Sequence, residues 1–157
     1  MSHDLHNFIP AHEVLESAIR FHEKAASLFD AWAKPELGER ERTFLPLVAA
    51  IEREAAKALA TYAGEHEDLA SLETWFQNAP GELPPNDALE ALEAHAGDTP
   101  LFCSELHAVH NQWLHVYEAF EKGAPIERVR ELFASCRALL LSKQQALSSA
   151  QNQLRDM

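Results

Sequence analysis

The sequence predicts an all-α protein, folded as an antiparallel four-helix bundle. Four long segments carry an apolar face that repeats with the period of an α-helix, about 3.6 residues. Proline or glycine stands at the ends of these segments, where helices begin or stop. A long connection, 64–99, separates the second segment from the third. Together these observations predict two helical hairpins joined by a long crossover with short helices.

The first hairpin is predicted from two segments, 10–34 and 42–63. Pro10 suits a first helical turn, and Pro35 stops the first helix from continuing. The second helix is expected to begin near residue 42, because Pro46 is best tolerated in a first turn.

The crossover 64–99 contains several proline and glycine turn signals. Between them we expect two short helical pieces, 68–77 and 87–95. The first piece carries Trp75 and Phe76, which either pack on the bundle or, if exposed, form a contact for a partner. A connection of this length can carry the chain back along the bundle before the third helix begins.

The second hairpin is predicted from segments 100–123 and 125–153. Thr99 is the expected N-cap of the third helix, followed by a proline at the first helical position. Gly123 ends that helix, and Pro125 is expected to open the fourth.

Composition indicates one domain, 1–157, with its own core. No apolar run reaches the roughly 18 residues that a membrane span needs, and the N-terminus lacks the pattern of a signal peptide. We therefore expect a cytoplasmic protein. The formal net charge of −12 repels phosphate backbones and anionic lipids, so nucleic acid and membranes are poor partners. Cys103 and Cys136 are expected to be core thiols.

Polar side chains interrupt the apolar face of each predicted helix. His22 lies near the centre of the first face, His110 on the third, and Lys143 on the fourth. On the second helix, Glu52 and Glu54 flank the apolar stripe. Such residues are often satisfied core histidines or lysines that extend outward along their stems. Their occurrence on several helices nevertheless suggests a cluster.

The positions of these residues along the bundle axis follow from counting along the helices. His22 and Glu52 both lie about 15 residues from the first hairpin turn, so they should be side by side. Between His110 and Lys143 the offset is roughly 8 Å, which a lysine stem could largely cover. We therefore expect a buried polar cluster of His22, Glu52, His110 and Lys143.

A second histidine adds a metal-binding alternative. His107 lies one turn before His110, and this spacing can chelate a metal from one helix. The candidate metal ligands are therefore His22, Glu52, Glu54, His107 and His110.

Seven-residue spacings suggest a faint internal repeat, because His22 precedes Phe29 by seven and His110 precedes Tyr117 by seven. In this arrangement the chain resembles the ferritin-like superfamily, and within it the rubrerythrin-like branch. The resemblance implies paired helical hairpins with a long crossover. It also implies a Glu ligand on the first helix of each hairpin and Glu-x-x-His on the second.

The sequence departs from that ligand pattern. His22 and His110 stand where the resemblance implies Glu, Glu52 lacks its histidine three residues on, and Lys143 occupies the second such histidine position. A di-iron centre needs about four carboxylates, so no conventional di-iron centre is expected. A hemerythrin-like bundle fits less well, since the fourth helix has no histidine.

Two functions follow from these residues. The first is a binding or structural module, acting as a homodimer or with a protein partner. In it the polar cluster is structural, with Glu52 or Glu54 paired to Lys143 while the histidines bridge. The alternative is a mononuclear zinc or non-haem iron site using His22, His110 and Glu52, which could support an oxidoreductase.

Overall fold

The computed structural model describes residues 9–65, 75–76, 83–85 and 87–155. Over these residues the regular structure is helical apart from one pair of two-residue strands, which confirms the predicted all-α class. The elements in chain order are β1 (Ile9–Pro10), α2 (Ala11–Trp32), α3 (Glu39–Glu65), β2 (Trp75–Phe76), α4 (Asp87–Glu90), the 3₁₀ helix η2 (Ala91–His95), α5 (Thr99–Gly123) and α6 (Glu127–Gln153).

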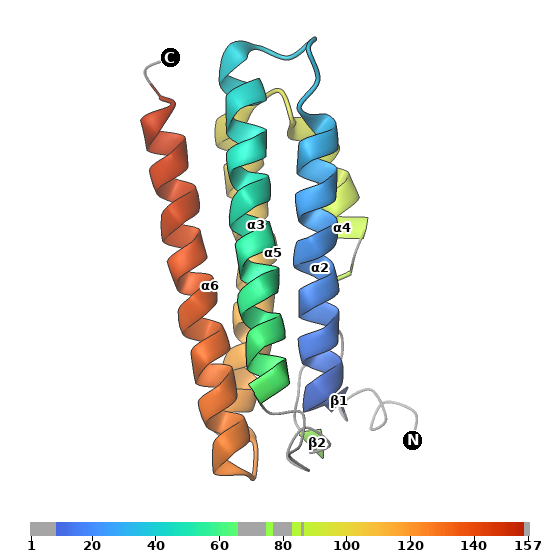
Figure 1. Cartoon of the computed structure of the whole chain (residues 1–157), viewed down its shortest axis with the longest axis vertical. Coiled ribbons are helices and arrows are strands. Elements are labelled where there is room, and N and C mark those ends of the chain that lie inside the picture. Colours follow the sequence, from blue (N-terminus) through green and yellow to red (C-terminus); the bar gives the residue numbers. More distant parts are fainter. Residues whose placement is uncertain (1–8, 66–74, 77–82, 86, 156–157) are drawn as a thin grey trace.

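The long helices α2, α3, α5 and α6 lie side by side along the long axis of the molecule (Figure 1). Helix α2 packs along α3, α5 packs along α6, and α3 also contacts α6. The short helices α4 and η2 lie against the outside of this group (Figure 1). Lys24 of α2 donates to Glu90 of α4 at 3.0 Å, and Leu89 and Leu92 are buried. The end of the crossover is therefore packed onto the long helices.

The strands differ from the prediction for the crossover. Ile9 pairs with Phe76 and Pro10 with Trp75, in antiparallel register. A helical piece was predicted over 68–77, and within it Trp75 and Phe76 are extended. Aromatic residues have high strand propensity, so a short pairing is compatible with their sequence. The rest of that predicted piece and the exposure of the two aromatic side chains lie outside the described residues. By contrast, the predicted piece 87–95 is confirmed as α4 and η2.

Helix α3 begins at Glu39, three residues before the prediction, so Pro46 lies inside it. Glu39 and Glu41 occupy the first turn, where negative charge interacts favourably with the helix N-terminus. Pro46 cannot donate a backbone hydrogen bond, and its side chain is exposed. Its neighbour Leu45 is buried, so packing of the apolar face maintains the helix at this point.

The start of α5 also differs in detail. Asp98, rather than Thr99, is the N-cap, and its carboxylate accepts a hydrogen bond from the Leu101 backbone N–H at 3.2 Å. Thr99 is the first helical residue and is buried. Helix α5 ends at Gly123 as predicted, while α6 begins two residues after Pro125 because Ile126 is still extended.

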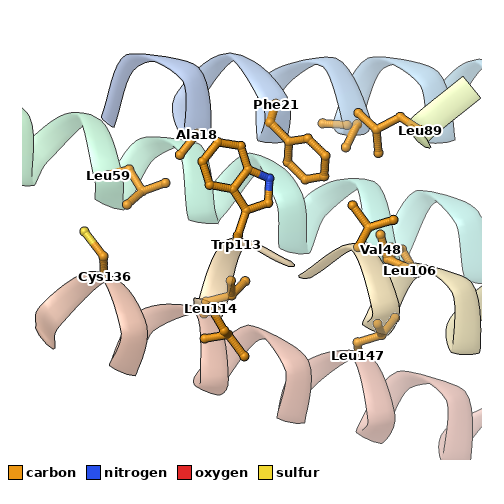
Figure 2. Packing of buried hydrophobic residues seen from close by; sticks show 14 of the residues in the cluster. Ala18, Phe21, Val48, Leu59, Leu89, Leu106, Trp113, Leu114, Cys136 and Leu147 are labelled. Atoms are coloured by element: carbon orange, nitrogen blue, oxygen red, sulfur yellow. The ribbon is translucent and has the colours of Figure 1, made fainter. Parts of the chain in front are cut away.

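A continuous apolar core joins the long helices. Figure 2 shows Trp113 of α5 at its centre, with Ala18 and Phe21 of α2 on one side and Leu114 and Leu147 on the other. The largest fully buried side chains are mostly aromatic: Trp113, Tyr117, Phe21, Phe29, Phe44, Phe102, Phe120 and Phe133. Cys103 and Cys136 are buried and free, as predicted.

Among the described residues, no helix is both long and apolar enough to cross a membrane.

Candidate metal centre

Three polar side chains from three different helices meet inside this core. They are His22 of α2, Glu52 of α3 and His110 of α5, and each is only 1% exposed. His22 and Glu52 are brought together because they lie at equal distances from the α2–α3 turn, as counting along the sequence predicts. His110 shares the buried face of α5 with Leu106 and Trp113, so it points to the same interior.

Glu52 stands between the two imidazoles. His110 donates from Nε2 to one carboxylate oxygen of Glu52, Oε1, at 2.7 Å. His22 donates from Nδ1 to the other oxygen, Oε2. The two imidazole rings are 5.9 Å apart between centroids. An ionised carboxylate only accepts hydrogen bonds, so each ring nitrogen that faces it carries a proton.

The charge of Glu52 is held by these neighbours. Burial by itself would raise the pKa of Glu52, but the charges and hydrogen bonds of His110 and His22 hold that pKa well below its usual range. Glu52 is therefore a carboxylate at neutral pH. A buried anion with two imidazoles is a donor set that can exchange its protons for a cation.

Lys143 was predicted to join this cluster and to pair with Glu52 or Glu54, and the structure pairs it with Glu54. Its ammonium donates to the carboxylate of Glu54 at 3.1 Å, and the Lys143 side chain is 18% exposed. Glu54 itself is 68% exposed. The stem of Lys143 follows the apolar surface outward and places the charge near water, as long cationic side chains commonly do. This ion pair keeps Lys143 and Glu54 on the surface, while His22, Glu52 and His110 are buried.

His107 was a further candidate ligand. It is half-buried, and its Nε2 lies 3.5 Å from the hydroxyl oxygen of Ser148 on α6. Burial and the nearby charge of His110 lower the pKa of His107. Although His107 and His110 are one turn apart on the same helix, only His110 belongs to the buried cluster.

One ligand atom from each of His22, Glu52 and His110 lies within 4.8 Å of the others. Bonds of about 2.1 Å to a single tetrahedral ion would separate such atoms by about 3.4 Å. Small side-chain rotations therefore suffice to form a two-histidine, one-carboxylate site. A di-iron centre does not fit, because Glu52 is the one buried carboxylate among the described residues.

Three buried polar atoms near the cluster have no hydrogen-bond partner among the described residues. They are Nδ1 of His110, Nε1 of Trp113 and the hydroxyl of Tyr117, all on α5. Trp113 and Tyr117 belong to the apolar face of that helix, so the hydrophobic pattern alone gives them no polar role. The spacing of three and seven residues from His110 was the available signal, since it places all three on one helix face.

Comparisons with known proteins leave the family open. No family model matches the chain, and no curated protein and no solved structure matches it. The resemblance to the ferritin-like superfamily therefore stays a prediction, based on the spacings in the sequence.

Proposed function

We propose that this chain is a helical-bundle protein that binds a single divalent metal ion, zinc or non-haem iron, through His22, Glu52 and His110. The observation that supports it is the meeting of three good ligand side chains, from three helices, within 4.8 Å inside the core. Two imidazoles and one carboxylate suit zinc, and they also match the ligand set of mononuclear non-haem iron enzymes.

The position of Lys143 strengthens this proposal. An ammonium beside the cluster would repel a cation, and the sequence gave reason to expect one there. Because Lys143 pairs with the exposed Glu54, that obstacle is absent from the described contacts. Coordination requires the ring nitrogens of His22 and His110 that face the metal to carry no proton, so protons compete with the metal and binding should weaken as pH falls.

Elemental analysis of protein purified without a histidine tag tests the proposal. We expect close to one zinc or iron per chain, and loss of that metal in the His22→Ala, His110→Ala double variant. His107→Ala is the matched control, since it removes a histidine from the same helix but outside the cluster, and it should keep its metal. Absence of metal from the wild-type protein after growth with zinc and iron would contradict the proposal.

A structural module is the second candidate, and one observation favours it. Both oxygens of Glu52 already accept hydrogen bonds from the imidazoles, so the cluster is largely satisfied without an ion. In that case the double variant would be less stable although neither protein holds metal, and function would lie on the surface. The homodimer or protein partner and the cytoplasmic location remain predictions.

For the fold we propose an antiparallel, ferritin-like four-helix arrangement. The segments 33–38 and 124–126 that join α2 to α3 and α5 to α6 are short, which favours antiparallel neighbours. A long connection between α3 and α5 and the contacts of α3 with α6 agree with a crossover bundle.

A further inference from the structure

The proposed metal ion would need a further ligand besides His22, Glu52 and His110. Three protein ligands leave at least one position open on a zinc or iron ion. In a buried site that position is filled by water or by another small ligand, and the ligand needs hydrogen-bond partners of its own.

The side chains of Trp113 and Tyr117 each carry a buried hydrogen-bond donor. Each is 1% exposed, and neither Nε1 of Trp113 nor the hydroxyl of Tyr117 is hydrogen-bonded within the described residues. Buried donors without a partner are rare in native proteins, because each has lost its hydrogen bonds to water without replacement. Two on adjacent turns of one helix indicate that a further species lies between or beside them.

The chemistry of the two groups defines that species. The indole N–H can only donate. Burial, with smaller effects from Cys136 and Glu52, raises the pKa of Tyr117 well above its usual range, so its hydroxyl keeps its proton. The species facing two such donors is therefore a hydrogen-bond acceptor.

Both side chains are close to the metal cluster. Trp113 and Tyr117 share a face of α5 with His110, and their rings are 6.1 Å apart. Phe21 connects this pair to the cluster, since its ring lies 5.2 Å from His22 and 5.6 Å from Trp113. Figure 2 shows the indole nitrogen on the side of Trp113 that faces Phe21. Tyr117 lies two turns after His110 on the same face of α5, and helical side chains lean toward the helix N-terminus, so the Tyr117 ring extends toward His110.

We propose that Trp113 and Tyr117 donate hydrogen bonds to a small acceptor ligand, such as water or a small anion, that completes the coordination of the metal. This inference rests on the metal site proposed above. The ligand must be small because Phe21, Trp113, Tyr117 and Phe133 are all closely packed and at most 1% exposed. The two side chains are positioning residues that select which small molecules reach the ion.

Azide binding to the cobalt-substituted protein tests this inference. Co²⁺ takes the place of zinc and reports its ligands through visible absorption, so azide should change the spectrum of the wild-type protein. Tyr117→Phe removes one hydroxyl at almost constant shape, and Trp113→Phe removes the indole N–H. Each variant should still bind one cobalt ion but should bind azide about tenfold more weakly, as expected for losing a hydrogen bond to a charged ligand.

Phe133→Leu is the packing control, because its ring lies 6.0 Å from Tyr117 and carries no donor. It should bind azide like the wild type, and circular dichroism checks that each variant is folded. Unchanged azide affinity in both donor variants, or no spectral response of the wild type to azide, would overturn the inference. Failure of the wild type to bind cobalt would instead refute the metal site itself, and the inference with it.

Discussion

Glu52 is the residue on which the interior depends most strongly. It is an anion in a closed core, and its charge is balanced by hydrogen bonds from His22 and His110 alone among the described contacts. Removing one partner from such a buried ionic group is costly, because the remaining groups lose their compensation and cannot reach water.

Glu52→Gln leaves an amide that can accept from one imidazole but presents its NH2 group to the other, so it should destabilise the metal-free protein by about 1–3 kcal/mol, measured by urea unfolding. Glu54→Gln is the matched control two residues away, since it weakens an exposed ion pair with Lys143. Such surface pairs contribute less than about 1 kcal/mol. Equal effects of the two substitutions would contradict the buried cluster.

The two cysteines give a second prediction at this scale. Burial raises the pKa of the Cys103 thiol to about 12 and that of Cys136 higher still. Because the thiolate is the reactive form, neither should react with a disulfide reagent in the folded protein at neutral pH. Titration with Ellman's reagent should detect almost no thiol before unfolding and two per chain afterwards. A fast-reacting thiol in the native protein would show that one of them reaches solvent.

Among the elements, α3 is the long helix whose start differs most from the prediction. The general rule that proline belongs in a first turn predicted a start near residue 42, whereas the helix begins at Glu39 and includes Pro46. Local propensity was overridden by burial of Phe44 and Leu45, which anchor this turn to the core.

Pro46→Ala tests whether α3 is helical through this position. If the helix begins at Glu39, alanine restores a missing backbone donor within a helix and should stabilise the protein by up to about 3 kcal/mol. If residue 46 instead lay outside a helix, no such bond would be restored, and loss of proline would be neutral or slightly destabilising through the unfolded chain. Thermal unfolding of the two proteins measures the difference. The side chain is exposed, so repacking of the core should not confuse the result.

For the whole molecule, helical periodicity was enough to predict the all-α class and the presence of all four long helices. Counting along α2 and α3 also predicted that His22 and Glu52 would meet. Whether Lys143 would pair with Glu52 or with Glu54 could not be predicted, because a long flexible stem can carry its charge to the core or to water. The pairing of Trp75 and Phe76 with β1 depends on contacts distant in sequence, which local patterns do not reveal.

A metal ion held by three helices should stabilise the entire fold. A ligand that binds only the folded state raises the free energy of unfolding by about 4.1 kcal/mol when its free concentration is 1,000 times the dissociation constant. The unfolding midpoint of metal-free protein should therefore rise as zinc is added, and the His22→Ala, His110→Ala variant should show no such rise. A similar rise in both proteins would indicate binding elsewhere.

The division of the ligands among the helices has a further consequence. His22 and Glu52 belong to the α2–α3 pair, and His110 belongs to the α5–α6 pair. A chain cut in the crossover would thus yield two fragments, neither of which carries the complete donor set. Co-expressed fragments should reassemble more tightly with zinc than with a chelator, as measured by size-exclusion chromatography. Equal association under both conditions would show that the apolar core alone joins them. If the association depends on zinc, the two fragments would form a complementation pair whose assembly is controlled by metal.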